Sequence, residues 1–284
     1  MKNIVLIPNM NKDVSGAATA RLANALSEMG LNLYSAEKYS ACLGESVKPY
    51  VEFPKDADLI IVVGGDGSVL DASVEAIAER VPIIGVNLGK VGYLSEVEPD
   101  NLGIFARLLS GDYSVEEKML LSLSINKNGE STGVGRFAVN DVVVSHENHL
   151  GITDCKIENS RGDSVSYRAD GIIFATPSGS TAYSLSAGGP VVAHNVECIL
   201  ATPVCPHSFF NRSILFSGED RITLTNTGVS DLNISIDGRF ISKLSSAESC
   251  TVTVSKNKLK MLTFSKDNMF STLFSKMRIM EDVK

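Results

Sequence analysis

The sequence predicts two domains of different classes, an N-terminal doubly wound parallel α/β domain and a C-terminal antiparallel β-rich domain of the sandwich type. The first ~100 residues alternate apolar runs of strand length with helix-like stretches, the pattern of a parallel sheet. After about residue 115 the pattern changes to short alternating runs, which are typical of antiparallel strands. We expect the first domain to span residues 1–112 and the second to span residues 113–265. With 284 residues, 44% of them hydrophobic, the chain is long enough to build both cores.

The elements of the first domain follow from apolar runs and from the signals that end helices. A helix over residues 15–29 is expected to end at Gly30, because glycine often occupies the position after a helix. A second helix is expected over residues 69–80. Strands are expected at the apolar runs 4–7, 31–34, 59–63 and 83–86.

The second domain is expected to consist of short strands. A hairpin is expected over residues 229–242, because Asp237-Gly238 favours a tight turn. The amphipathic stretch 268–277 is expected to form a helix. The expected strands are 120–125, 136–145, 154–158, 164–168, 221–225, 232–236, 251–254 and 259–263.

Composition and charge exclude several classes of function. The formal net charge is -7 and no run of lysine or arginine is present, so we expect no nucleic-acid partner. Five scattered cysteines without metal-ligand spacing indicate reduced thiols in a cytoplasmic protein. The first apolar run is too short for a signal peptide, and no segment is long enough to span a membrane, so we expect no membrane partner.

The first motif is a glycine turn, Gly64-Gly65-Asp66-Gly67-Ser68, between an apolar strand and a helix. Its glycines let the backbone approach an anion closely, and the following helix adds a favourable dipole for phosphate. Asp66 is unexpected there, because a carboxylate repels phosphate. It fits the site if it orients or deprotonates a nucleophile or holds a bridging metal ion, and otherwise it caps the helix.

The second motif is the segment 170–190, in which an apolar strand leads into a turn rich in hydroxyl groups. Pro177 and Gly179 end the strand. Ser180 or Thr181 is expected to cap a following helix, whose first N–H groups would face a polar ligand.

Two further segments carry polar residues where the pattern is otherwise apolar or glycine-rich. Asn140 and Asp141 interrupt an expected strand, which marks either a site or a β-bulge or sheet edge. The glycine-rich segment 85–94, which includes Tyr93, follows a strand at the carboxyl end of the sheet, where open α/β folds bind ligands.

In their order and spacing these motifs resemble those of the NAD kinases. The glycine turn alone is similar to turns of phosphofructokinases, diacylglycerol kinases and sphingosine kinases, whereas segment 170–190 is far more specific to NAD kinases. The resemblance continues through residues 202–212 and through Asp237-Gly238-Arg239, and it covers most of the chain from residue 58 onward. The first 57 residues carry no motif.

The resemblance implies transfer of the γ-phosphoryl group of ATP to the 2′-hydroxyl of the adenosine ribose of NAD, which gives NADP. It implies that Gly64, Gly65 and Gly67 surround the phosphate, that Mg²⁺ neutralises developing charge and that Asp66 positions or deprotonates the hydroxyl. Hydrogen bonds to the ribose would suit the Asp141 carboxylate, and stacking on a base would suit Tyr183. The expected dinucleotide-binding residues are Tyr93, Asn140, Asp141, Arg168, Asp170, Thr181, Ala182, Tyr183, Ser186 and Arg239.

The resemblance also implies a homodimer or homotetramer in which Asp170 contacts a dinucleotide shared with a neighbouring subunit. It implies that a helix within residues 266–284 packs on the first domain. Arg168 stands where the family carries arginine in members that prefer NAD over NADH. Two positions depart from the family pattern, because Ser68 replaces the more usual threonine and Arg239 stands where glutamine is common.

Two other functions stay open at this point. A lipid kinase of the same superfamily would account for the glycine turn, and a non-catalytic dinucleotide sensor would bind NAD without releasing NADP. The donor stays open beyond ATP, because some relatives accept polyphosphate. His146 and His149 lack further zinc ligands, and His207 is assigned to structure, so no metal site built from protein side chains is expected.

Overall fold

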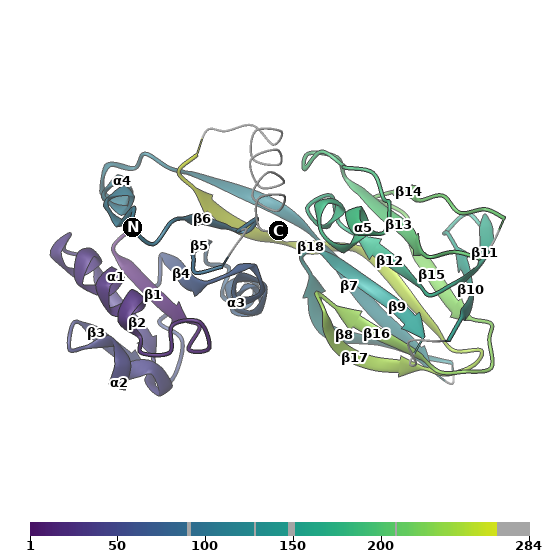
Figure 1. Cartoon of the computed structure of the whole chain (residues 1–284), viewed down its shortest axis with the longest axis horizontal. Coiled ribbons are helices and arrows are strands. Elements are labelled where there is room, and N and C mark those ends of the chain that lie inside the picture. Colours follow the sequence, from purple (N-terminus) through teal and green to yellow (C-terminus); the bar gives the residue numbers. More distant parts are fainter. Residues whose placement is uncertain (90–91, 128, 147–150, 208, 266–284) are drawn as a thin grey trace, which may run out of the picture. The chain divides into compact units, whose positions relative to one another are not determined.

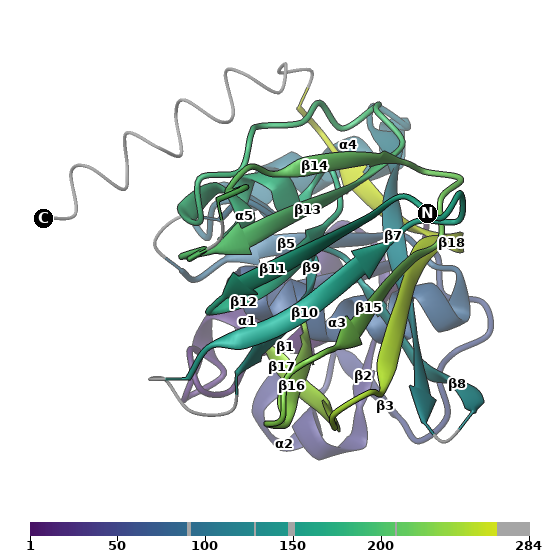
Figure 2. The same ribbon diagram turned by 90° about the vertical axis from the view of Figure 1, so that its right-hand side faces the viewer.

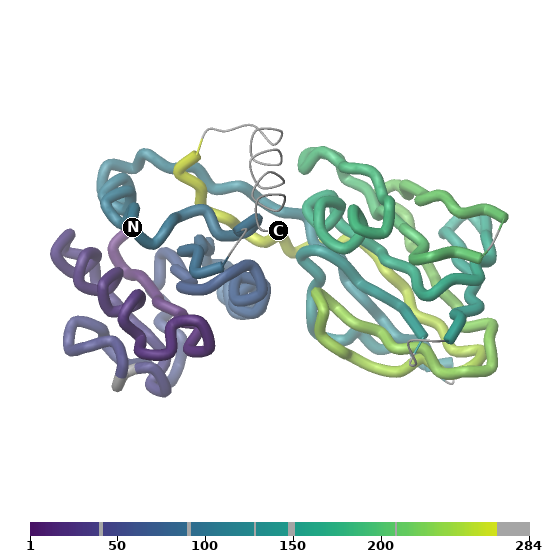
Figure 3. The backbone as a smooth tube through the Cα atoms, viewed as in Figure 1, coloured from purple at the N-terminus to yellow at the C-terminus, as the bar shows by residue number. Residues whose placement is uncertain are grey.

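The computed structural model describes residues 1–89, 92–127, 129–146, 151–207 and 209–265 (Figure 1). The chain divides into two compact units, one made of Met1–Glu117 and the segment from Leu259 onward, the other of Lys118–Lys258. The backbone therefore passes from the first unit to the second and returns (Figure 3). No helix in the described part of the chain is long and apolar enough to cross a membrane.

The first unit is built on a parallel sheet, as its alternating sequence predicts. The strand order is β18-β5-β4-β1-β2-β3, with β6 beside β5, and all of these pairs are parallel. Every residue of β4 and β5 is buried, as expected of strands covered on both faces. The strands are β1 (Asn3–Pro8), β2 (Asn32–Ala36), β3 (Val47–Tyr50), β4 (Leu59–Gly64), β5 (Ile83–Asn87) and β6 (Ser95–Val97).

Helices cover this sheet, and their ends follow the sequence signals. The expected glycine ending is confirmed, because Gly30 has a φ of +80° and the Leu31 N–H donates to the Leu26 carbonyl at 3.2 Å. Leu22 and Leu26 of the first helix join the core. The helices are α1 (Ala17–Glu28), η1 (Glu37–Tyr39), α2 (Ser40–Leu43), α3 (Asp66–Glu79), η2 (Leu102–Ala106) and α4 (Arg107–Ser110).

The second unit contains two sheets of antiparallel strands with an apolar core between them (Figure 2). One sheet has the order β14-β13-β12-β9-β16-β17, and the other brings together β11, β10, β15, β18, β7 and β8. The strands are β7 (Ser114–Lys127), β8 (Glu130–Ala138), β9 (Asp141–His146), β10 (Thr153–Glu158), β11 (Ser164–Ala169), β12 (Gly171–Ala175), β13 (Cys198–Val204), β14 (Ile214–Ser217), β15 (Ile222–Asn226), β16 (Leu232–Ile236), β17 (Arg239–Leu244) and β18 (Ser249–Thr263). The sandwich expected from the alternating runs is confirmed.

Two strand predictions need correction. Residues 136–145 do not form one strand, because β8 and β9 belong to different sheets and Asn140 lies in the link between them. Residues 251–254 and 259–263 are parts of the single strand β18. The predicted hairpin is confirmed, with Asp237 and Gly238 at φ +48° and +76° between β16 and β17. The helix expected over 268–277 lies outside the described residues.

Candidate functional site

The glycine turn lies in the first unit, at the carboxyl end of β4 and the start of α3. Gly65 occupies the N-cap with no side-chain cap, and the helix begins at Asp66 rather than at residue 69. The capping role considered for Asp66 is therefore wrong. A Cβ on Gly64 would collide with the Ser68 hydroxyl, whereas a Cβ on Gly67 would meet no atom within 4 Å. The turn therefore has no space for a side chain at Gly64, whereas the space beside Gly67 is open.

The Asp66 carboxylate holds the loop that follows β5. Its two oxygens accept the N–H groups of Tyr93 and Leu94, each at 2.9 Å. Burial, followed by the charge of Asp66, raises the pKa of the Tyr93 phenol. The structure therefore brings Tyr93 next to the glycine turn, as the shared sheet edge predicts, and it assigns Asp66 a structural contact that the sequence did not indicate.

The loop between β1 and α1 also joins this turn, although the first 57 residues show no motif. The Asn9 side chain donates to the Ser68 hydroxyl at 2.6 Å, and the Asn9 N–H donates to the Val63 carbonyl at 2.8 Å. The Lys12 ammonium lies against Gly65, where a Cβ would collide with it. Asn9 and Lys12 follow an ordinary β1 strand, and only the parallel neighbours β1 and β4 bring them to the turn.

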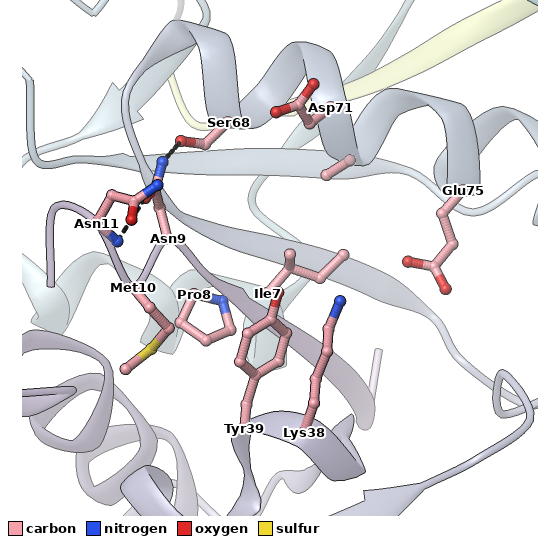
Figure 4. Close-up of a pocket in the computed structure, with 11 residues that line it drawn as sticks. Ile7, Pro8, Asn9, Met10, Asn11, Lys38, Tyr39, Ser68, Asp71 and Glu75 are labelled. Atoms are coloured by element: carbon pink, nitrogen blue, oxygen red, sulfur yellow. Dashed lines mark hydrogen bonds between the residues drawn. The ribbon is translucent and has the colours of Figure 1, made fainter. Parts of the chain in front are cut away.

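A pocket of about 420 Å³ opens beside the turn, entirely within the first unit (Figure 4). It combines the Tyr39 ring and the Lys38 ammonium with carboxylates of α3, and it reaches the glycine turn through Asn9 and Ser68. Burial raises the pKa of the Glu75 carboxyl. The lining residues are Ile7, Pro8, Asn9, Met10, Asn11, Lys38, Tyr39, Ser68, Asp71, Ala72 and Glu75.

The second group of predicted residues lies in the other unit, around the link between β8 and β9. The Asp237 carboxylate accepts the N–H groups of three successive residues, Val139 at 2.9 Å, Asn140 at 2.8 Å and Asp141 at 3.0 Å. The Asp237 N–H donates in return to the Asp141 carbonyl at 3.0 Å. Asn140 lies in the link between β8 and β9 and Asp141 begins β9, and the hairpin turn clamps both residues. The alternative of a bulge or sheet edge is wrong, because β9 is paired in regular register on both sides.

Asp141 is buried, with 5% of its surface exposed. Burial, followed by the charge of Asp237, raises the pKa of Asp141 to about 7. Burial also raises the pKa of Asp237, although its three amide donors and Arg136 act in the opposite direction. Two carboxyl groups therefore share one low-dielectric region, which disfavours their simultaneous ionisation.

The segment after β12 packs against the same link. The Thr176 hydroxyl donates to the Val139 carbonyl at 2.7 Å, and the Thr176 N–H donates to the Asn140 carbonyl at 2.9 Å. A Cβ on Gly179 would collide with the Asn140 backbone, so glycine is required by this close approach. Asn140 is thus held from two sides.

The helix in this segment is short, with η3 over Gly179–Thr181 and α5 over Tyr183–Ser186. The predicted cap is wrong, because α5 has Ala182 at its N-cap and no side-chain cap. The Thr181 hydroxyl donates instead to the Ser178 carbonyl, and the Ser180 hydroxyl to the Pro177 carbonyl. A helix of four residues has only a small dipole. Polar ligand groups would therefore be bound by side chains and by the N–H groups of the turn.

Tyr183 is an exposed aromatic residue among the predicted residues of this unit. Its side chain is 46% exposed. Burial raises the pKa of the Tyr183 phenol, with further contributions from Cys205, Asp141 and Asp170. Ala182 is partly buried and Ser186 is exposed beside it.

The remaining predicted residues lie on exposed strand ends. Asp170 connects β11 to β12 and is exposed, and Arg168 on β11 lies 3.7 Å from the Asp154 carboxylate. Arg239 begins β17 and is exposed. The His207 backbone N–H donates to the Arg168 carbonyl at 2.7 Å. Among the described residues no group of three or more acidic, histidine or cysteine side chains could hold a metal, and His149 lies outside them.

Two family models and several relatives match this chain over most of its length. A model of the ATP-NAD kinase N-terminal domain matches residues 9–113, and a model of the ATP-NAD kinase C-terminal domain matches residues 139–264. An NAD kinase of Lachnoclostridium phytofermentans is 32% identical over 283 residues, covering 97% of this chain and 99% of the relative. An NAD kinase of Caldanaerobacter subterraneus is 34% identical, covering 98% and 99%.

Solved structures share the fold. Yeast NADH kinase complexed with NADH superposes with a TM-score of 0.83 at 21% identity, covering 96% of this chain and 86% of the yeast chain. An NAD kinase from Archaeoglobus fulgidus in complex with ATP superposes with a TM-score of 0.73 at 24% identity, covering 98% and 99%.

Proposed function

The chain belongs to the ATP-NAD kinase family, and we propose that its two groups of site residues bind the two substrates of that family's reaction. Its activity is that of an NAD kinase, a phosphotransferase that converts NAD to NADP at the expense of ATP. This division of roles rests on one observation, which is that each unit contains one segment held by an aspartate. Asp66 holds the loop beside the glycine turn in the first unit, and Asp237 holds the Asn140 link in the second.

The first unit binds the phosphoryl donor. Gly64, Gly65 and Gly67 present the start of α3 to the phosphates, and the open space above Gly67 leaves room for them. The adjoining pocket of about 420 Å³ has the size of a small-molecule site and suits the donor's nucleoside. Mg²⁺ enters with the triphosphate, since it usually binds through substrate phosphates and one or two carboxylates rather than a protein cage.

The second unit binds NAD. The Asp141 carboxyl hydrogen-bonds the ribose hydroxyls, the Tyr183 ring stacks on a base, and neighbouring hydroxyl and amide groups orient the dinucleotide. Asp66 then positions the 2′-hydroxyl or accepts its proton as the γ-phosphoryl group is transferred. The other dinucleotide contacts come from Tyr93, Asn140, Arg168, Asp170, Thr181, Ala182, Ser186 and Arg239.

We further propose a homodimer or homotetramer, a cytoplasmic location and a preference for NAD over NADH. The exposed position of Asp170 supports a contact with a neighbouring subunit, and the five unpaired cysteines support a reducing compartment. The preference for NAD rests on Arg168, whose side chain is 62% exposed beside Asp154.

The deciding experiment incubates the protein with NAD, ATP and Mg²⁺ and follows the formation of NADP. Parallel reactions replace NAD with diacylglycerol or sphingosine, and polyphosphate replaces ATP. Production of NADP with no phosphorylated lipid is the expected result. A protein that binds NAD but forms no NADP would be a sensor, and lipid phosphorylation without NADP would indicate the lipid kinase.

A further inference from the structure

We propose that Lys12, in the loop between β1 and α1, binds the phosphate chain of the phosphoryl donor at the glycine turn. The inference rests on the proposed donor site and adds to it a cationic side chain from a segment that carries no motif. The ligand chemistry is a chain of phosphates, and we assign it to the donor rather than to the diphosphate of NAD.

The Lys12 ammonium lies close to two glycines, Gly65 and Gly89. A Cβ on Gly65 would collide with the Lys12 Nζ, and a Cβ on Gly89 would lie 3.2 Å from it. Neither glycine has a positive φ, so backbone conformation does not require glycine at either position. Their missing side chains instead give the ammonium access to the start of α3.

The loop that carries Lys12 is anchored on the same turn. The Lys12 N–H donates to the Asn9 carbonyl at 3.0 Å, and the Asn9 side chain donates to the Ser68 hydroxyl at 2.6 Å. The acidic neighbour Asp13 is directed elsewhere, because its carboxylate accepts the Ala18 and Thr19 N–H groups at 3.1 and 2.8 Å. Lys12 therefore approaches the turn without being neutralised by the residue beside it.

The dipole of α3 disfavours an ammonium at this position, and a bound anion would offset that effect. The N-terminus of a helix carries partial positive charge, so a lysine is normally favoured at the opposite end. Gly65 is the N-cap of α3, and the Lys12 ammonium lies against it. The Asp66 carboxylate nearby is directed to the N–H groups of Tyr93 and Leu94. A phosphate at the turn would accept from the helix N–H groups and from the ammonium together, which resolves the repulsion.

The test compares Lys12→Met, which keeps the aliphatic stem, with Lys12→Arg, which keeps the charge. Lys55→Met is the matched control, because Lys55 is an exposed lysine of the same unit outside the turn. Binding of inorganic tripolyphosphate is measured by titration calorimetry, which reports on phosphate binding without turnover. The KM for ATP and the KM for NAD are measured separately.

Lys12→Met is expected to weaken tripolyphosphate binding and kcat/KM for ATP by ~10- to 100-fold, the effect of one hydrogen bond to a charged group. Lys12→Arg should retain most of the binding, and Lys55→Met should match the wild type. The KM for NAD should stay unchanged in all three. Since the Lys12 side chain is exposed, thermal stability should also stay unchanged.

The proposal is overturned if Lys12→Met binds tripolyphosphate as the wild type does, or if Lys55→Met loses as much affinity. It is also overturned if Lys12→Met raises the KM for NAD and not that for ATP. A wild-type protein that uses ATP but does not bind tripolyphosphate contradicts it equally. Failure to form NADP would refute the proposed function instead, and the calorimetric comparison of the two lysines would still decide the role of Lys12.

Discussion

Asp66 has one role that the structure shows, which is to hold a loop, and one catalytic role that we propose. Its carboxylate accepts two backbone N–H groups of the loop after β5, and it lies in the turn assigned to the donor phosphates. An asparagine has one acceptor oxygen, so its amide N–H₂ would face one of the two loop N–H groups. A substitution there changes structure and chemistry together, and a matched control is needed to separate them.

We expect Asp66→Asn to lower kcat by ~10²-fold or more, the scale of a positioned acid–base group. It should also lose ~1–3 kcal/mol of stability, because one loop N–H loses its partner. The control is Asp58→Asn, since Asp58 accepts the N–H groups of Lys2 and Asn3 at 2.6 and 3.0 Å in the same unit, outside the site. The stability loss of Asp58→Asn should be the smaller one in chemical denaturation, because a single Asp58 oxygen accepts both N–H groups and the asparagine carbonyl can replace it. A kcat per folded molecule that falls equally in both would mean that Asp66 is structural.

The raised pKa of Asp141 predicts how the stability of the fold depends on pH. An unfolded chain ionises this group near its ordinary pKa of 3.8, whereas burial and the charge of Asp237 raise the pKa in the folded chain to about 7. Between these values only the folded chain retains the proton, so a rising pH destabilises the fold, with the full penalty reached above pH 7. Asp141→Asn removes this ionisation while keeping the size of the side chain.

The stability of Asp141→Asn relative to the wild type should therefore increase as pH rises from about 5 to about 8, by at least ~2 °C in Tm. Thermal unfolding of both proteins in the same buffers provides the measurement. Because other groups titrate in both proteins, the difference between the two curves reports the ionisation of Asp141 together with its coupling to Asp237. Parallel curves over this range would show that the Asp141 carboxyl ionises normally in the folded chain.

At the scale of elements, the sequence predicted the strands and the hairpin better than the segments that connect one sheet to another. The parallel strands β1, β2, β4 and β5 and the Asp237-Gly238 hairpin were predictable, because apolar runs and turn residues are local signals. The short strands β3 and β6 were not predicted. The sequence around Asn140 predicts one interrupted strand, since a change of sheet leaves no mark in an alternating pattern. The proximity of Lys12 to the glycine turn has no sequence signal for a related reason, as only the pairing of β1 with β4 brings the two together.

The contact between the segment after β12 and the link before β9 gives an element-scale prediction. Gly179→Ala would place a Cβ into the Asn140 backbone, which cannot retreat because Asp237 clamps it. We expect a loss of ~1–3 kcal/mol in stability, the usual cost of overpacking. NAD affinity, measured by calorimetry, should fall with it, because Asn140 and Asp141 move together.

Gly133→Ala is the matched control in the same unit, because a Cβ there meets no atom within 4 Å. This variant should retain both wild-type stability and wild-type affinity for NAD. If Gly179→Ala binds NAD as tightly as Gly133→Ala does, the packing of Gly179 against the Asn140 link does not affect NAD binding.

At the scale of the whole molecule, the proposed oligomer predicts that subunits complement one another. Asp66 and Asp170 belong to different units, and the exposed Asp170 is assigned to the site of a neighbouring subunit. Asp66→Asn and Asp170→Asn chains should each be nearly inactive alone. A mixed dimer, however, contains one site in which both carboxylates are intact, formed by Asp66 of one subunit and Asp170 of the other.

Equal co-expression of the two variants should restore about a quarter of the wild-type activity, because half of the randomly assembled dimers are mixed and each has one intact site. The measurement is NADP formation by purified mixtures, with each variant alone as the control and sedimentation to establish the oligomer. If mixing restores nothing although mixed oligomers form, Asp170 acts within its own subunit. If the protein is fully active as a monomer at the assay concentration, the proposal of a site shared between subunits is wrong.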